Sequence, residues 1–286
     1  MAAELCERSI VAREQFSAAA EILGYDLLKL CAEGPAEDLD STAYSQPAIY
    51  VSSLAALEQL RLDEPAVIDN CVVTAGLSLG EYTALTFAGA LAFEDGLRVV
   101  AERGAAMQDA SEAAPSGMVS ILGLEVPVIQ DLVDQARGDD VLEIANLLCP
   151  ANTVVSGATA ACERIAELAE KQGAMRVVPL AVAGAFHTAL MQPAVERLKT
   201  KLAGVTINPP SIPVLSNVDA QTHDDPEEIR DLLVRQVVNP VRWEDSMKRL
   251  IDDHSAEVCY EVGPGRVLRG LLKRINRKLA CESVPA

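Results

Sequence analysis

The feature that most constrains this chain is a serine between two glycines, at the point where an apolar run meets the start of a helix. It lies in residues 71–89, CVVTAGLSLGEYTALTFAG. Residues 72–74 predict the end of a buried strand, and apolar residues recur at helical spacing from Leu79 onward. Between them, residues 76–80 read GLSLG, the G-x-S-x-G pattern of a nucleophile elbow centred on Ser78.

The elbow predicts a reactive hydroxyl at Ser78. In such a turn the two glycines leave room for a sharp bend that exposes the serine above the sheet. The following helix points its N-terminus at that oxygen, so we expect the backbone N–H of Leu79 to stabilise an oxyanion on a bound acyl group. The alternative is a Gly-rich strand-to-helix turn in which Ser78 only caps the helix, because the bare motif also occurs in such turns.

Composition excludes several classes of function. The 286 residues are enough for one large domain, or for one domain with a smaller one inserted. A formal net charge of -18 argues against a nucleic-acid or anionic-membrane partner, because the field of the protein repels phosphate. Seven scattered cysteines without C-x-x-C spacing, and no signal peptide or membrane-spanning stretch, predict a soluble cytoplasmic protein.

No metal or cofactor site is predicted. None of the three histidines, His187, His223 and His254, forms a zinc or haem pattern with another histidine or with a cysteine. His187 lies in VAGAFHTALM, after a predicted strand and beside an apolar pair. We expect a catalytic role for it, although a lone histidine in apolar surroundings is more often a satisfied core residue.

The hydrophobic pattern of the sequence changes between residues 117 and 180. The patterns predict strands at 118–124, 141–147, 153–157 and 175–180, and helices at 126–136 and 158–172. This β-α-β-β-α-β order is typical of a ferredoxin-like unit. We therefore expect an α/β fold with an α/β-hydrolase-like parallel-sheet domain, residues 1–116 and 181–286, and an inserted ferredoxin-like subdomain, residues 117–180, that forms one wall of a cleft.

Other elements are expected on both sides of this insertion. A helix is predicted to begin at Pro47, which suits a first helical position. Residues 212–217 and 258–262 predict strands, and residues 226–238 and 243–251 predict helices. A last helix from about Val267 is surrounded by cations: Arg266, Arg269, Lys273, Arg274, Arg277 and Lys278. This basic cluster is either a binding surface or a solvated face that complements the helix dipole.

Arg103 has an unusual setting in the helix predicted from about Phe93 to Ala113. Leu97, Val100, Arg103 and Met107 fall at three- and four-residue steps on one face. Arginine ordinarily belongs on the solvated face. Its apolar neighbours favour a buried site for an anion.

Five motifs together carry a family resemblance: GLSLGEYTAL, RGAAM, AVAGAFHTALM, LVRQVVNPV and EVGPGRVLRGL. In this order, and over nearly the whole chain, the sequence resembles malonyl-CoA:acyl carrier protein transacylase, the acyltransferase of fatty acid and polyketide synthesis. The resemblance implies ping-pong transfer of malonyl from malonyl-CoA, through an acyl-serine, to the phosphopantetheine thiol of acyl carrier protein in fatty acid biosynthesis. It implies malonyl-CoA as a substrate and no further cofactor.

The resemblance also implies residue roles. The family's nucleophile falls on Ser78, its general base on His187 and its carboxylate-binding arginine on Arg103. The family orients its histidine with a backbone carbonyl, and the matching position is Gln236.

Two further positions match the acyl pocket. Met107 corresponds to a pocket residue, and Phe186 stands where malonyl-specific members carry phenylalanine before the histidine. The basic helix after Arg266 is a candidate dock for the phosphates of coenzyme A or for an acidic carrier protein.

Two departures leave other functions open. Leu77 replaces a histidine that many members carry, and no G-Q-G loop, whose glutamine completes the family's oxyanion hole, is found near Met1. We therefore expect the 286-residue chain to be weakly active, and an acyl-binding relative with impaired catalysis is one alternative. The other is a serine esterase of the α/β-hydrolase type, although there the histidine usually lies near the chain end, and 99 residues follow His187 here.

Overall fold

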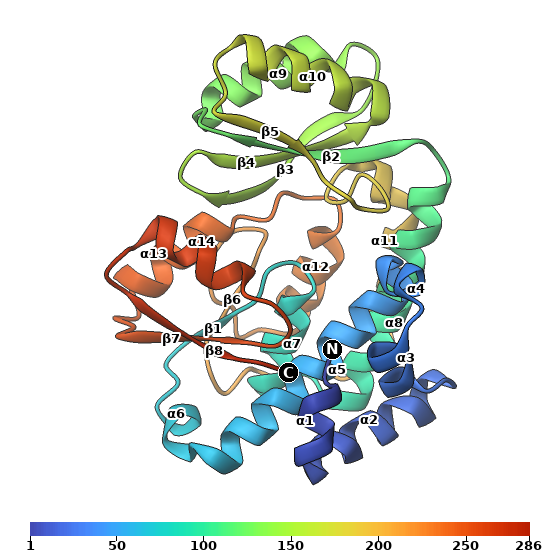
Figure 1. The fold of residues 1–286 in the computed structure, drawn as a ribbon, viewed down its shortest axis with the longest axis vertical. Coiled ribbons are helices and arrows are strands. Elements are labelled where there is room, and N and C mark those ends of the chain that lie inside the picture. Colours follow the sequence, from blue (N-terminus) through green and yellow to red (C-terminus); the bar gives the residue numbers. More distant parts are fainter.

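The N-terminal part of the chain is helical. In the computed structural model, which describes residues 1–286, it forms α1 (Ala3–Arg8), α2 (Ile10–Leu23), α3 (Leu27–Glu33), α4 (Ala36–Asp40), α5 (Thr42–Asp63) and α6 (Pro65–Asp69) (Figure 1). The prediction that a helix begins at Pro47 is wrong, because α5 begins five residues earlier and contains this proline. The start signal is Ser41, whose side chain accepts a hydrogen bond from the backbone N–H of Ala43.

The elbow joins a very short strand to a helix, and a second helix follows. These are β1 (Thr74–Ala75), α7 (Gly80–Phe87) and α8 (Phe93–Glu112). Strand β1 pairs in parallel with β6 (Val214–Leu215), a connection between segments far apart in the sequence. The expected buried strand over 72–74 is therefore only partly correct: the ladder covers two residues, and Val72 is 52% exposed.

Residues 116–179 build a separate four-stranded antiparallel sheet with two helices on one face (Figure 1). The elements are β2 (Ser116–Leu122), α9 (Val126–Arg137), β3 (Leu142–Cys149), β4 (Asn152–Ala158), α10 (Thr159–Lys171) and β5 (Arg176–Pro179), with strand order β3-β4-β2-β5. All six predicted elements are present in the predicted order. They enclose a hydrophobic core of 12 buried residues. We propose that residues 117–180 are the ferredoxin-like subdomain.

The chain then returns to the larger part of the molecule. It forms a 3-10 turn, η1 (Ala189–Met191), then α11 (Gln192–Ala203), β6, α12 (Pro226–Gln236), α13 (Trp243–Asp252), β7 (Val258–Val262), α14 (Val267–Ile275) and β8 (Ala280–Val284). Strands β7 and β8 pair in parallel, apart from β1 and β6. The structure is thus mixed α/β, but its parallel strands form two separate pairs, and the α/β-hydrolase-like detail stays a prediction.

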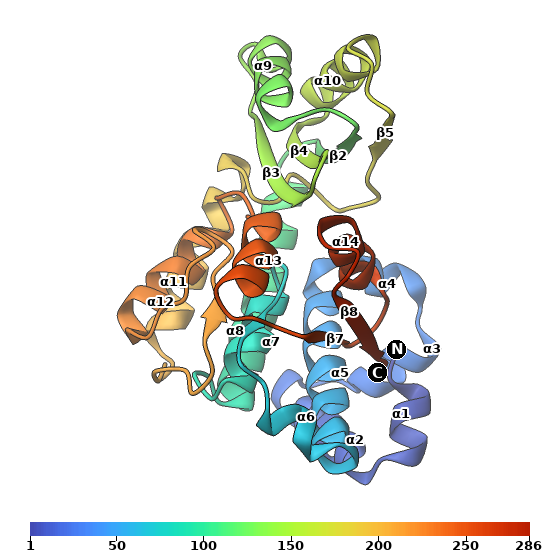
Figure 2. The ribbon, with the colours of Figure 1, turned by 90° about the vertical axis from the view of Figure 1, so that its left-hand side faces the viewer.

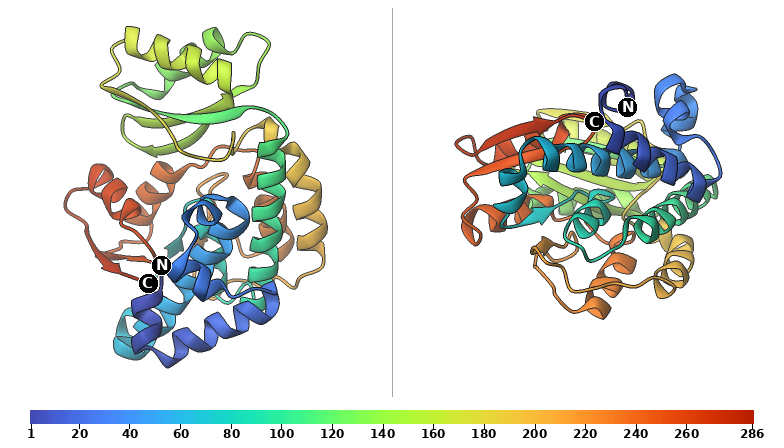
Figure 3. Two further views of the ribbon diagram at one scale, coloured as in Figure 1. Left: turned by 45° about the vertical axis from the view of Figure 1, so that its right-hand side comes forward. Right: turned by 90° about the horizontal axis from the view of Figure 1, so that it is seen from below.

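The views agree on the arrangement of these parts. The small sheet stands at one end of the molecule, with α14 in contact with it and with β7 and β8 beside α5 (Figure 2). The two chain ends lie side by side in every view, next to β8 and α1 (Figure 3). No helix is both long and apolar enough to cross a membrane.

A core of 40 buried residues holds the larger part together, and α5 packing against α8 is its central contact. Gly104 on α8 permits this approach, because a Cβ there would lie 2.3 Å from the backbone oxygen of Thr42. The Thr42 hydroxyl also donates a hydrogen bond of 2.8 Å to the Gly104 carbonyl. The close contact brings Arg103, the neighbour of Gly104, toward the start of α5.

Replacing Gly104 with alanine should therefore force α5 and α8 apart. We expect Gly104→Ala to lower the free energy of unfolding by about 1–3 kcal/mol, the usual cost of overpacking. Gly270→Ala in α14 is the matched control, since its Cβ would meet no atom within 4 Å. That variant should gain about 0.5–1 kcal/mol from helix propensity. Urea unfolding of both variants measures the difference, and equal stabilities would contradict the assigned role of Gly104.

Candidate active site

Ser78 lies in the tight turn that links β1 to α7. Its backbone is in the left-handed region, with φ of 50°, which is uncommon for a residue with a side chain. A Cβ on Gly76 would lie 1.9 Å from the backbone carbon of Gly80, so glycine is required at this position. The G-x-S-x-G motif thus forms the sharp turn that the sequence predicted.

Asn217, which follows the neighbouring strand β6, holds this strained turn in place. Its side-chain oxygen accepts a hydrogen bond of 2.6 Å from the backbone N–H of Ser78, and its side-chain nitrogen donates one of 2.8 Å to the carbonyl of Gly76. Asn217 is fully buried and follows β6, the strand that pairs with β1. One amide side chain therefore ties both sides of the serine together.

His187 contacts the serine hydroxyl from the segment that follows the small sheet. Its Nε2 lies 2.9 Å from Ser78 Oγ, and its Nδ1 lies 2.8 Å from the backbone carbonyl of Gln236. A carbonyl can only accept, so Nδ1 carries the proton and Nε2 presents a lone pair to Ser78. His187 also has a positive φ, 62°, so both members of the pair are held in uncommon backbone conformations.

Arg103 lies against the same hydroxyl and is 1% exposed. Its Nη2 donates to Ser78 Oγ and to the side-chain oxygen of Gln236, each at 2.9 Å, and its Nη1 donates to Gln46 Oε1 at 2.6 Å. The guanidinium also lies over the ring of Tyr82, 5.5 Å from its centroid. The helical spacing correctly predicted that Arg103 is buried.

The electrostatics keep His187 neutral. Burial and the positive charge of Arg103 lower the pKa of His187 to about 4, although the carbonyl of Gln236 acts in the opposite direction. Because Ser78 Oγ accepts a hydrogen bond from Arg103, its own proton is directed to Nε2 of His187. The Ser78 hydroxyl therefore has a neutral base, His187, on one side and a cation, Arg103, on the other.

The remaining predicted residues surround this group. The N–H of Leu79 donates no hydrogen bond within the chain, so it is free to receive an oxyanion. Met107 is buried, and its sulfur accepts from the side-chain nitrogen of Gln46 at 3.6 Å. Phe186 is half-buried and packs against both the main core and a small cluster beneath the four-stranded sheet. The structure thus brings the predicted residues together, while their roles in catalysis remain predictions.

Three contributing residues were missed from the sequence: Gln46, Asn217 and Glu81. Asn217 carried a usable signal, because it ends a predicted strand, and the carboxyl ends of neighbouring parallel strands meet at one edge of a sheet. Glu81 carried a weaker one, as a carboxylate one turn after the nucleophile. Nothing in the sequence around Gln46 distinguishes it, since its contact with Arg103 depends on how α5 packs against α8.

No group of three or more potential metal ligands is present. An open hollow of about 560 Å³ lies between α8 and α11, lined mainly by charged residues such as Arg98 and Arg197. It does not include Ser78.

Comparison with known families and proteins gives one consistent answer. Residues 1–283 match the acyl transferase domain family. The chain is 44% identical over 277 residues to the mitochondrial malonyl-CoA-acyl carrier protein transacylase of Mus musculus, covering 93% of this chain and 73% of that protein. It is 41% identical over 284 residues to the malonyl CoA-acyl carrier protein transacylase of Haemophilus influenzae, covering 99% and 90%.

Solved structures agree with the sequence relatives. The malonyl CoA-acyl carrier protein transacylase of Coxiella burnetii superposes with a TM-score of 0.94 at 36% identity, covering 99% of this chain and 89% of that one. A malonyl-transacylase solved in complex with a type II PKS acyl-carrier protein superposes with a TM-score of 0.93 at 35% identity, covering 99% and 90%.

The clamp on the elbow leads to a prediction about reactivity. Asn217→Ala leaves the Ser78 amide without its acceptor, so we expect a loss of about 1–3 kcal/mol in the free energy of unfolding. The freed turn should also react more slowly with a serine-directed fluorophosphonate. The matched control is Asn70→Ala, which removes one exposed hydrogen bond to the Ala66 carbonyl. If both variants unfold and label like the parent, Asn217 does not hold the elbow.

Proposed function

Because this chain belongs to the acyl transferase domain family, we propose that it transfers the malonyl group of malonyl-CoA to the phosphopantetheine thiol of an acyl carrier protein. One arrangement supports this function above all: a neutral histidine and a buried arginine that contact the same serine hydroxyl. The reaction needs no cofactor beyond its two substrates, and it serves fatty acid biosynthesis in the proposed setting.

The first half of the reaction acylates Ser78. His187 Nε2 takes the hydroxyl proton as Oγ attacks the thioester carbonyl, and the N–H of Leu79 stabilises the resulting oxyanion. The intermediate collapses when the C–S bond breaks, and His187 returns its proton to the departing coenzyme A thiolate. The second half reverses these steps, with the carrier thiol giving its proton to His187 and attacking the acyl-serine. This order requires ping-pong kinetics.

Arg103 selects a dicarboxylic acyl group. At rest its Nη atoms donate to three neutral acceptors, from Gln46, Gln236 and Ser78, and its Nε has no partner although it is buried. A malonyl carboxylate offers charged acceptors, which bind a guanidinium more strongly than neutral oxygens do. An acetyl group would leave the same cation without a counter-charge. Met107 and Phe186 complete an acyl pocket too small for a branched chain.

The basic cluster is the proposed contact surface for the substrates' acidic groups. Its six residues are exposed, and none takes part in an ion pair: Arg266, Arg269, Lys273, Arg274, Arg277 and Lys278. Helix α14 also contacts β3 of the small sheet. In a chain with a formal net charge of -18, this local positive surface would attract the phosphates of coenzyme A or an acidic carrier protein.

The alternatives predict different chemistry at Ser78. An esterase of the α/β-hydrolase type would hydrolyse its acyl-serine rapidly, and an impaired acyl-binding relative would not form one. The family assignment favours the transferase over both, and the Ser78–His187 contact argues against the impaired relative. A reducing compartment such as the cytoplasm suits seven unpaired cysteines, and we propose that location, although two of the relatives are mitochondrial proteins.

Acylation of Ser78 tests the proposal directly. Incubation with malonyl-CoA should add the mass of one malonyl group, which persists until a carrier thiol is supplied. Ser78→Ala should show no mass gain while it keeps its fold, and His187→Ala should acylate about 10²-fold to 10⁴-fold more slowly, the usual effect of losing a general base. Acylation of Ser78→Ala at the parent rate would exclude this serine as the nucleophile.

Selectivity tests Arg103 separately. We expect Arg103→Ala to lose malonyl transfer and to gain relative activity toward acetyl-CoA, because the unpaired charge that disfavours neutral acyl groups is removed. The measurement is kcat/KM for both substrates. Arg98→Ala, which removes an exposed arginine of the same helix, is the matched control. Equal losses on both substrates would indicate structural damage instead of lost recognition.

A further inference from the structure

Glu81 is a buried carboxylate for which the mechanism above has no use. It lies on the first turn of α7, directly after the nucleophile elbow, and is 3% exposed. Burying a carboxylate is costly unless hydrogen bonds and a counter-charge compensate for its lost hydration. Its contacts therefore indicate what the carboxylate does there.

Two hydrogen bonds of Glu81 lead to the active site. Its Oε2 accepts hydrogen bonds of 2.6 Å from Nε2 of Gln236 and of 3.1 Å from the backbone N–H of Asn217. Asn217 is the residue that clamps the amide of Ser78. Gln236 supplies the backbone carbonyl that orients His187.

The carboxylate also helps to fix which way the amide of Gln236 faces, together with the backbone carbonyl of Ser78, to which Gln236 Nε2 donates a hydrogen bond of 3.0 Å. With Nε2 toward Glu81, the side-chain oxygen of Gln236 points at Arg103 and accepts its hydrogen bond of 2.9 Å. The opposite orientation would place the amide oxygen against a carboxylate and the NH₂ group against a cation. A neutral amide thus bridges a buried anion and a buried cation, and each charge favours the same orientation.

We propose that Glu81 is a positioning residue for acyl transfer, whose carboxylate fixes the Gln236 amide and the Asn217 backbone, and through them the arrangement of Ser78, His187 and Arg103. The inference rests on the function proposed above. It adds a residue that touches no substrate and acts through its neighbours.

The charge of Glu81 gives the proposal a pH signature. Burial raises the pKa of Glu81 to about 7, while hydrogen bonds from Gln236 and Asn217 and the charge of Arg103 act in the opposite direction. Below about pH 7 the group gains a proton and loses the charge that strengthens both hydrogen bonds. The pKa of His187 is lowered to about 4, so the general base stays neutral over the range in which Glu81 titrates.

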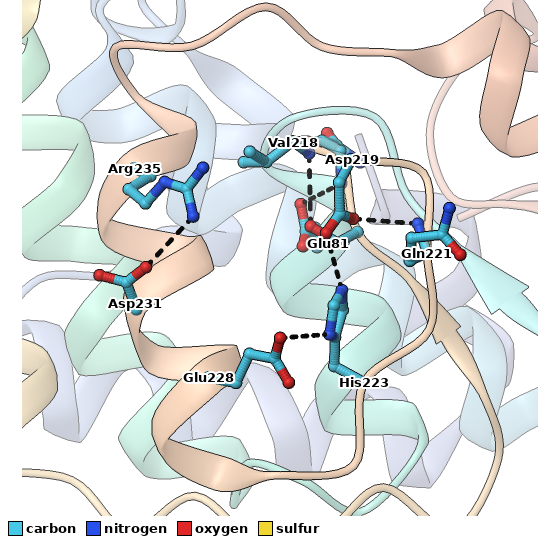
Figure 4. A network of polar contacts seen from close by, with 10 residues as sticks. Glu81, Val218, Asp219, Gln221, His223, Glu228, Asp231 and Arg235 are labelled. Atoms are coloured by element: carbon cyan, nitrogen blue, oxygen red, sulfur yellow. Dashed lines mark hydrogen bonds and ion pairs between the residues drawn. The ribbon is translucent and has the colours of Figure 1, made fainter.

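Arg103, His223, Asp219 and Glu228 are the other charged or titratable groups near Glu81. Arg103 approaches from α8 through Gln236. His223, on the segment after β6, lines the same small cavity as Glu81, and its ring nitrogens lie 3.0 Å from Asp219 and 3.1 Å from Glu228 (Figure 4). Both of these carboxylates contact His223, and the Gln236 amide hydrogen-bonds to neither of them (Figure 4).

The experiment measures the rate of Ser78 acylation at saturating malonyl-CoA, by rapid quench and mass spectrometry, between pH 5 and pH 9. The wild-type rate should fall on the acid side with an apparent pKa near 7. Glu81→Gln should be about tenfold slower at pH 8, because a charge-assisted hydrogen bond is replaced by a neutral one, and should lack the acid limb near pH 7. The two rates should therefore converge at pH 5.5. Glu167→Gln, at an exposed position on α10, should follow the wild type.

A second variant separates positioning from general damage. Gln236→Ala keeps the backbone carbonyl that His187 needs and removes the amide on which Glu81 acts. Adding Glu81→Gln to it should slow acylation by clearly less than in the wild-type background, as expected for two residues in one network. Fully additive losses would overturn the proposal.

The remaining outcomes are also decisive. A wild-type profile with an acid limb only near pH 4, or a Glu81→Gln variant that keeps a limb near pH 7, overturns the role of Glu81. If Glu81→Gln does not fold, the wild-type and Gln236→Ala profiles decide, since the latter should also have a weakened limb near pH 7. Absence of wild-type acylation at every pH would instead refute the proposed function.

Discussion

The burial of the Arg103 guanidinium is the constraint on which this site depends. A cation removed from water needs acceptors from every direction, and no carboxylate contacts it directly. Gln46 comes from α5, Gln236 from α12 and Ser78 from the elbow, so one side chain requires three separate segments to meet. The close packing of α5 on α8 at Gly104 brings Gln46 within hydrogen-bond distance of Arg103.

Backbone strain is concentrated where chemistry is expected. Ser78 and His187 both have positive φ angles, and neither is glycine. Such conformations persist only when the surroundings over-determine them. Here they do: Asn217 bonds both sides of the elbow, and the ring of His187 is bonded at both nitrogens. A flexible turn would place the hydroxyl over a wider range of positions, whereas this one presents it to a single base.

Much of this arrangement could be predicted from the sequence, for physical reasons that differ by residue. The elbow follows from the G-x-S-x-G motif, and the buried Arg103 and the β-α-β-β-α-β order follow from local hydrophobic patterns with periods of two and 3.6 residues. The start of α5 was misplaced because Pro47 is a weaker start signal here than the Ser41 cap. Helix α11 and strand β8 were not predicted, and β8 is half-exposed and partnered only by β7.

The hydrogen bonds that Gln46, Glu81 and the side chain of Gln236 make around the site were harder to predict from the sequence. Gln46 and Glu81 act through contacts between segments far apart in the chain, and polar side chains of this kind leave no periodic signal. The family resemblance pointed to Gln236 for its backbone carbonyl only. Its side chain, which bridges Arg103 and Glu81, emerged from the structure.

The use of a carbonyl to orient His187 has an electrostatic consequence. A carboxylate at Nδ1 would raise the pKa of the imidazole, whereas the carbonyl of Gln236 only partly offsets burial and the charge of Arg103, which lower it. The base is then neutral when substrate arrives, but the imidazolium that forms during attack lies near a cation that no carboxylate contacts directly. A malonyl carboxylate on Arg103 removes that repulsion, and an acetyl group does not. In the proposed mechanism the buried arginine therefore discriminates twice, once when the acyl group binds and again when the proton moves to His187.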